Sequence, residues 1–232
     1  MSQPGQRRHY GKGVLVILLV VNLSLLAACS SREPAPTSLY PKVSNVHTLL
    51  VVPFGIAAEG YQVGSTARCS MCGTIFVTGP TAPGDAKYLT DQLLTYLKTK
   101  TDYTLIPPGA GAGVRAHILS ETVDMPERDL LLQMGQKLNA DAVVSGKIFR
   151  FRQRIGTSYA VDTPASVAFS MYLLRVADGD MIWAGNFDET QRPLSDDLLQ
   201  ISTWAKRGAR FLTAEELAHF GLTKVMATFP VP

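Results

Sequence analysis

The first 29 residues hold the sequence feature that most limits what this chain can fold into. Three basic side chains between residues 7 and 12 precede an apolar run that begins at Val14, and small residues then lead to Cys29. A basic flank, a short apolar core and small residues occur in this order in secretory signals, which are removed from the mature protein. Residues 1–28 are therefore predicted to be a signal peptide that takes no part in the fold.

The segment LAAC, which ends at Cys29, resembles the lipobox of bacterial lipoproteins. The resemblance implies that the chain is cut before Cys29, that its sulfur is diacylated through a thioether, and that the new N-terminus is acylated. Three acyl chains, at about 0.8 kcal/mol per buried CH₂, anchor a protein far more firmly than the single chain that binds reversibly. Cys29 is thus the predicted lipid attachment site of a protein that faces the periplasm.

Two other fates of this segment stay open. One is a plain transmembrane anchor, which the length of the apolar stretch disfavours because a span needs roughly 20 such residues. The other is a secreted form that is cleaved elsewhere. Ser30, rather than Asp, follows the cysteine, and by resemblance to the sorting rule of enteric lipoproteins this favours the outer membrane.

The charge balance argues against nucleic-acid binding. The chain carries 22 basic and 19 acidic side chains, and three of the basic ones lie in the predicted signal peptide with no acid beside them. Removing those three leaves 19 basic side chains, equal to the number of acidic ones. A protein that neutralises phosphates needs a basic stripe, and the sequence shows none.

The mature chain is predicted to be one domain on a short tether. Residues 29–40 form the tether, since the segment SSREPAPTS (residues 30–38) has two prolines and no periodicity. Prolines hold such a segment extended, at up to about 3.1 Å per residue. Residues 41–232 suit a single periplasmic domain of ordinary size.

Hydrophobic periodicity and turn signals divide this domain into strands and helices. Two early helical crossovers favour parallel pairing, whereas Asp178-Gly179 predicts an antiparallel hairpin. The predicted class is a single α/β domain, with helices packed on a mixed sheet of about five strands. Strands are expected over His47–Phe54, Asp102–Ile106, Ala142–Arg154, Ala165–Val176 and Met181–Asp188. Helices are expected over Asp85–Lys98, Pro126–Asn139, Ser195–Lys206 and from a capping box at Thr213 and Glu216, with one or two helical turns over Gly113–Val123.

A Cys-x-x-Cys motif, Cys69 to Cys72, lies in a long connection over Gly55–Pro83. A disulfide is typical of cysteines in an oxidising periplasm. A zinc knuckle needs four ligands, so a second subunit or a histidine such as His47 or His117 would have to supply the others. A thioredoxin-type redox site belongs at a helix N-terminus, and the extended pattern after Cys72 argues against it. All three interpretations stay open.

Arginines alternate with aromatic residues along the third predicted strand, in the order Phe149, Arg150, Phe151, Arg152 and then Arg154. Successive side chains of a strand point to opposite faces. The three guanidinium groups are therefore expected on one face and both rings on the other. Such a face is either an anion- or partner-binding surface or a solvated surface opposite the core.

Patterns typical of enzymes are missing from the sequence. It has no G-x-S-x-G, no H-E-x-x-H and no phosphate-binding glycine loop, and its four histidines are scattered. We therefore predict a protein that is not an enzyme, with no small-molecule substrate and with no cofactor unless zinc binds Cys69 and Cys72.

Three segments resemble a domain that several envelope proteins share. VVPF (residues 51–54) and ADAVVSGKI (140–148) are similar to the pattern VxPF…ADAVVxGxV, and LLRVADG (173–179) followed by IW (182–183) is similar too. The pattern is seen in the curli-secretion lipoprotein, in the lipoprotein activator of a penicillin-binding protein and in the N-terminal domain of TolB. The resemblance implies an envelope lipoprotein of that fold.

These features together predict a lipid-anchored module that binds another envelope protein or assembles with itself. The sheet edges or the Gly55–Pro83 connection would provide the contact surface. One alternative is a subunit of an outer-membrane secretion apparatus related to the curli pore. Another is a periplasmic thiol oxidoreductase that uses the two cysteines of the Cys-x-x-Cys motif.

Overall fold

The computed structural model describes residues 45–57, 61–122, 124–192, 205 and 208–232. The predicted signal peptide, the lipid attachment site Cys29, the tether and, apart from Ala205, the predicted helix Ser195–Lys206 lie outside these residues. Within the described ranges, no helix has the length and apolar character needed to cross a membrane.

A mixed sheet forms the centre of the fold. Its strands, within the described residues, are β1 (Thr48–Val51), β2 (Gly55–Ile56), β5 (Thr104–Ile106), β6 (Ala142–Arg152), β9 (Ser166–Arg175) and β10 (Met181–Thr190). Their order is β10-β9-β6-β1-β5, with β2 beside β6. β1 runs parallel to β5 and β6, whereas β6, β9 and β10 form an antiparallel meander. The predicted α/β class, mixed sheet and final hairpin are confirmed.

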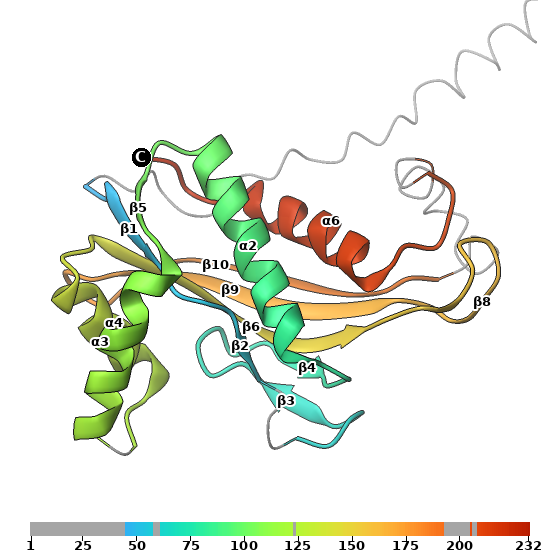
Figure 1. Cartoon of the computed structure of the whole chain (residues 1–232), viewed down its shortest axis with the longest axis horizontal. Coiled ribbons are helices and arrows are strands. Elements are labelled where there is room, and N and C mark those ends of the chain that lie inside the picture. The colour runs from blue at the N-terminus through green and yellow to red at the C-terminus, as the bar shows by residue number, and fades with distance from the viewer. Residues whose placement is uncertain (1–44, 58–60, 123, 193–204, 206–207) are drawn as a thin grey trace, which may run out of the picture. The chain divides into compact units, whose positions relative to one another are not determined.

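Helices and two small hairpins cover this sheet. The helices are α2 (Pro83–Lys100), α3 (Pro108–Glu121), α4 (Glu127–Lys137) and α6 (Ala214–Met226), and the hairpins are β3 (Thr66–Arg68) with β4 (Ile75–Val77) and β7 (Ile155–Gly156) with β8 (Val161–Thr163). Figure 1 shows α2 and α6 over one face of the sheet, and α3, α4 and the β3–β4 hairpin over the other.

Strand β1 shows how the sequence sorts side chains between the two faces. Leu49 and Val51 pack with α2 and α6, whereas Leu50 and Val52 pack with α3 and α4. All four side chains are buried. A strand whose successive residues are all apolar is therefore a strand covered on both faces, as the sequence predicts for a central position.

Helix α2 confirms the prediction over Asp85–Lys98. Its buried side chains Leu89, Leu93 and Leu97 recur every four residues and so form one stripe that faces the sheet. Pro83 occupies the first turn, where a missing N–H costs nothing. The Asp85 carboxylate accepts a 2.6 Å hydrogen bond from the Ala82 N–H. These local signals explain why this helix was readable from sequence.

Helix α3 is longer than the one or two turns predicted over Gly113–Val123. It begins at Pro108, and three of its first six residues are glycines. Glycine lowers helix propensity, so this segment lacks a local helix signal. Its packing supplies the reason for the helix, because Gly111 is buried and a Cβ there would lie 3.0 Å from Met134 Cε of α4. The absence of a side chain lets the two helices approach.

The predicted long connection over Gly55–Pro83 holds more structure than expected. It contains β2 and the β3–β4 hairpin. The ring of Phe76 on β4 stacks on Phe149 of β6, with ring centroids 4.2 Å apart. This apolar contact places the hairpin over the sheet. The extended pattern after Cys72 predicted β4, whereas β2 and β3, with two and three residues, are too short for periodicity to reveal them.

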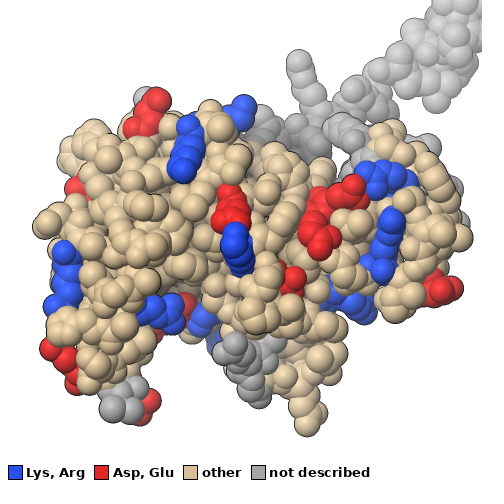
Figure 2. Space-filling view, viewed as in Figure 1, with Lys and Arg blue, Asp and Glu red and all other residues tan. Residues whose placement is uncertain are grey.

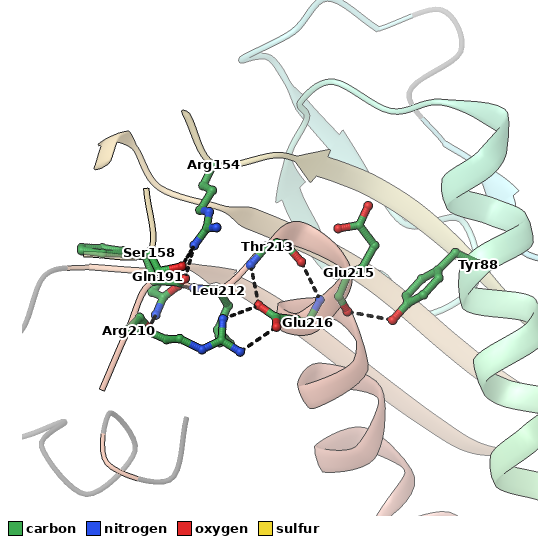
Figure 3. A network of polar contacts seen from close by, with 10 residues as sticks. Tyr88, Arg154, Ser158, Gln191, Arg210, Leu212, Thr213, Glu215 and Glu216 are labelled. Carbon is green, nitrogen blue, oxygen red and sulfur yellow. Dashed lines mark hydrogen bonds and ion pairs between the residues drawn. The ribbon is translucent and has the colours of Figure 1, made fainter. Parts of the chain in front are cut away.

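Helix α6 begins at the capping box that Thr213 and Glu216 predict (Figure 3). The Thr213 hydroxyl accepts a hydrogen bond from the Glu216 N–H at 3.2 Å, and the Glu216 carboxylate accepts one from the Thr213 N–H at 2.9 Å. Arg210 donates to both oxygens of the same carboxylate, at 2.8 and 2.7 Å. Gln191, at the end of β10, accepts from the Leu212 N–H at 2.8 Å and so joins this network to the sheet.

The Glu216 carboxylate is expected to make stability depend on pH. Hydrogen bonds from Arg210 lower its pKa from 4.5 to about 2. The stabilisation is thus complete above about pH 4.5 and is lost as the pH falls towards about 2, because the unfolded chain takes up the proton first. Replacing Glu216 with glutamine should flatten the free energy of unfolding across this window, measured by urea titration.

The matched control for this prediction is Glu121→Gln, which removes an exposed carboxylate from α3. That variant should keep the pH dependence of the parent chain between about pH 4.5 and 2. Equal slopes for Glu216→Gln and the parent would contradict the role given to Arg210.

Candidate functional site at the β3–β4 turn

Cys69 and Cys72 lie in the turn that joins β3 to β4. The Cys69 N–H donates to the Thr74 carbonyl at 2.8 Å, and the Gly73 N–H donates to the Cys69 carbonyl at 3.0 Å. Gly73 has φ of 74°, a left-handed conformation that glycine adopts without strain. Backbone hydrogen bonds and one glycine therefore hold the two cysteines in a closed turn.

The two sulfur atoms have different surroundings. Cys69 is 1% exposed, and its Sγ lies 3.2 Å from the Cys72 N–H donor and 3.4 Å from the Ser170 hydroxyl. Cys72 is half-buried, and its thiol lies 3.5 Å from Asn186 Oδ1. Both cysteines are free thiols in this structure. The turn thus rests with one sulfur against β9 and the other against β10.

The hydrogen bonds around the sulfurs separate their acidities. A hydrogen bond from the Cys72 thiol lowers the pKa of Cys69 to about 5, although burial opposes this shift. The same contact and burial raise the pKa of Cys72. The single thiol proton of Cys72 can point to Cys69 or to Asn186. The buried sulfur is consequently the one that carries negative charge first as the pH rises.

A polar network beside the cysteines ties the turn to α4 and the sheet. Glu127, in the first turn of α4, accepts hydrogen bonds from Ser70 at 3.0 Å and from the Tyr172 hydroxyl at 2.7 Å. Lys147 Nζ lies 2.5 Å from Glu127 Oε2. Burial and the Glu127 carboxylate raise the pKa of Tyr172, so its hydroxyl stays a donor. The network holds the turn in place. None of these contacts between described residues places a proton-accepting side chain at either sulfur atom.

The described residues supply two thiols and no further metal ligand at this turn. No group of three or more His, Cys, Asp and Glu side chains that could hold a metal ion occurs among them. His117 lies on α3, where its Nε2 is 3.5 Å from Glu121 Oε1. Zinc at Cys69 and Cys72 therefore stays a prediction that requires ligands from elsewhere, such as a second subunit.

The turn also differs from the site of a thioredoxin-type redox motif. Residues 75–77 after the cysteines form strand β4, as the extended pattern predicts. The motif therefore stands between two strands and does not begin a helix that follows a strand. Hydrogen bonds from Cys72 and Ser170 account for the lowered pKa of Cys69 instead.

A β-bulge in β6 changes the face on which the aromatic residues lie. The register shifts between Ile148 and Arg150, so that Phe149 and Arg150 share the hairpin face while Phe151 packs on the other face against Tyr88 of α2. The expectation that both rings occupy one face is wrong. An inserted residue breaks the alternation on which it was based.

The three arginines of this strand engage different parts of the fold. Arg150 is buried, donates to the Ser166 hydroxyl and the Val77 carbonyl, both at 2.6 Å, and pairs with Asp188. Arg152 donates to the Pro164 carbonyl at 3.4 Å. Arg154 donates to the Phe211 carbonyl at 2.5 Å. Arg150 therefore holds β4 to the sheet, and a partner-binding role for the three side chains stays a prediction.

An apolar outer face on the hairpin was not predicted. Ile75 and Val77 on β4 are 64% and 48% exposed, and Val63 and Tyr61 just before β3 are 70% and 49% exposed. Between them Phe76 is buried. The sequence signal for this face was the unbroken apolar run Ile-Phe-Val. When such a strand packs one face on a sheet and nothing covers its other face, the apolar side chains on that other face are exposed.

The charges visible on the molecule agree with the predicted neutrality. In Figure 2, Lys and Arg are interspersed with Asp and Glu, and the described residues of this face show no stripe of one sign. The projection at the bottom of Figure 2, where Figure 1 places β3, is almost entirely neither acidic nor basic. In the sequence, Arg68 is the one charged residue between Tyr61 and Pro83.

No protein-family model matches the chain, and no curated protein matches it. Similar solved structures include a PelC dodecamer from Paraburkholderia phytofirmans, with 13% identity, a TM-score of 0.47 and coverage of 83% of this chain and 94% of that one. The C-terminal domain of LpoB from Salmonella enterica has 17% identity, a TM-score of 0.39 and coverage of 64% and 86%. Lipoprotein GNA1162 from Neisseria meningitidis has 14% identity, a TM-score of 0.37 and coverage of 70% and 98%. A lipoprotein is thus among the similar structures, and the identity is below 20% in each of the three.

Proposed function

We propose that this chain is a lipid-anchored protein of the outer membrane that faces the periplasm and serves as a non-enzymatic binding or assembly module. Its partner is another envelope protein or a second copy of the chain. The lipobox that ends at Cys29 supports the anchor. The observation that carries the binding role is the exposed apolar pair Ile75 and Val77 on the outer face of the β3–β4 hairpin.

This face is presented by a hairpin that other contacts hold in place. Phe76 stacks on Phe149, and the Gly79 N–H donates to the Phe149 carbonyl at 3.0 Å. Arg150 adds its hydrogen bond to the Val77 carbonyl. The side chains of Ile75 and Val77 therefore take no part in the core, and exposed apolar side chains that share one face are typical of protein interaction sites.

The composition of the hairpin suits a contact that excludes water. Thr66 pairs with Val77 and Arg68 pairs with Ile75 across the two strands, so these four side chains share the outer face. Arg68 alone among them carries charge. Burying such a face costs little desolvation of charged groups, because long basic side chains keep their head in water while the stem packs.

A double substitution on the hairpin tests this contact surface. Ile75→Thr with Val77→Thr keeps β-branched side chains on β4 and removes apolar area, so the fold should persist. We expect crosslinking of envelopes to recover the partner or the oligomer at least about fivefold less efficiently than with the parent chain, as a loss of about 1 kcal/mol or more of binding free energy implies.

The matched control for the hairpin variant is Ile155→Thr, which changes a 60% exposed side chain on β7. It should leave recovery unchanged. Equal recovery with the hairpin variant would move the contact surface elsewhere on the molecule. A parent chain that is a free monomer under every crosslinking condition would oppose the binding role itself.

A further inference from the structure

The two thiols of the β3–β4 turn differ in the access that solvent has to them. Cys69 is 1% exposed and lies against Ser170, whereas Cys72 is half-buried at the rim of the turn. A reagent from solution therefore meets Cys72 first. Because the Cys72 N–H donates to Cys69 Sγ at 3.2 Å, the second sulfur is already beside the residue that the reagent reaches.

We propose that this turn is a site of thiol–disulfide exchange, in which Cys72 forms a mixed disulfide with an external disulfide and the buried Cys69 resolves it. The co-substrate belongs to the chemical class of disulfides, small or protein-borne. This activity goes beyond the proposed binding function and does not depend on it.

The reaction balances as two displacements at sulfur. As Cys72 Sγ attacks an external disulfide R–S–S–R, its proton passes to the hydrogen-bonded Cys69 thiolate. Cys72 forms a bond to one sulfur and expels the other as R–S⁻, which takes this proton from Cys69. The Cys69 thiolate then attacks Cys72 Sγ and expels the second R–S⁻, which is protonated in turn. The protein starts with one thiol and one thiolate and loses two electrons and one proton. With a second proton from water, the external disulfide becomes two thiols.

The surroundings of Cys69 favour its role both in forming the disulfide and in the reverse reaction, its reduction. The Ser170 hydroxyl and the Cys72 N–H lie within hydrogen-bond distance of its sulfur and stabilise the thiolate. Both contacts lower the pKa of Cys69 and persist in the mixed disulfide, whereas the larger effect of the Cys72 thiol acts only before Cys72 reacts. A stabilised thiolate is present to attack the mixed disulfide, and in the reverse reaction it is the better leaving group when an external thiolate attacks Cys72. The disulfide should therefore be readily reduced.

The order of the two sulfurs can be tested by intact mass spectrometry with oxidised glutathione as the probe. The full chain in detergent carries Cys29→Ala, so that Cys69 and Cys72 are its only cysteines. The parent should lose two hydrogens and hold no glutathione. Adding Cys69→Ser should leave one glutathione on Cys72, and adding Cys72→Ser should slow modification about tenfold or more, because the remaining thiol is shielded.

A measurement in urea separates shielding from intrinsic reactivity. Once the chain is unfolded, Cys69→Ser and Cys72→Ser should react with glutathione disulfide at similar rates, which shows that the fold sets the difference. A further variant, Ser170→Ala, should lengthen the lifetime of the mixed disulfide in the native chain. Similar native rates for the two serine variants, or two stable adducts on the parent, would overturn the proposal.

Discussion

Replacing Cys29 with alanine is expected to leave the chain uncut and without lipid. The acyl chains are attached through its sulfur and through the N-terminus that the cut creates, so one substitution removes all three. Each buried CH₂ of an acyl chain contributes about 0.8 kcal/mol to membrane binding, and the variant loses this contribution for all three chains. Intact mass should show residues 1–28 retained, and the acyl mass should be missing.

A matched substitution separates the lipid site from its neighbours. Ser30→Ala changes the residue that follows Cys29 and keeps LAAC, so that variant should be cut and acylated like the parent. Lipid mass and unchanged processing in the Cys29 variant would contradict the lipobox. We would then have to reconsider the periplasmic location predicted for the domain after Cys29, and with it the class of partner.

Replacing Trp183 with alanine is expected to cause the largest loss of stability within the described fold. The side chain is fully buried on β10, and its ring meets Phe229 edge-on with centroids 4.9 Å apart. Its indole N–H donates to the Thr228 hydroxyl at 3.2 Å. Removing a buried aromatic side chain of this size costs about 3–5 kcal/mol, since a cavity remains.

The surroundings of Trp183 indicate that this cavity cannot close easily. A Cβ on Gly185 would already lie 2.8 Å from the Trp183 ring and 2.4 Å from Val225 of α6, so strand and helix are in close contact on both sides. Urea unfolding should give a lower midpoint with an unchanged slope. Trp183→Phe keeps an aromatic ring and should lose less. A loss below about 1 kcal/mol for the alanine variant would contradict the packing of α6 on β10.

Much of the fold was readable because its signals are local. Leu89, Leu93 and Leu97 predicted α2 through their spacing. Asp178-Gly179 predicted the β9–β10 hairpin, and Gly179 has the positive φ, 76°, that such a turn requires. Each of these signals depends on residues within one or two turns of the chain, so no distant contact had to be known.

The candidate site was half readable for the same reason. The spacing of Cys69 and Cys72 is visible in the sequence, but the side chains that distinguish them are not near them in the chain. Ser170 is 101 residues from Cys69, and Asn186 is 114 residues from Cys72. Sheet register brings Ser170 and Asn186 opposite each other on β9 and β10, and so places both beneath one turn.

Taken alone, the amino-acid order determined the predicted signal peptide, the α/β class, the central strands and the capping box of α6, because apolar periodicity and turn chemistry act over short distances. The tertiary structure decided which cysteine is shielded, that Phe149 joins the hairpin face through a bulge, and that Ile75 and Val77 face outward. Whether a side chain is buried depends on segments that are distant in sequence. A three-residue strand has too short a pattern to show which of its faces such a segment covers.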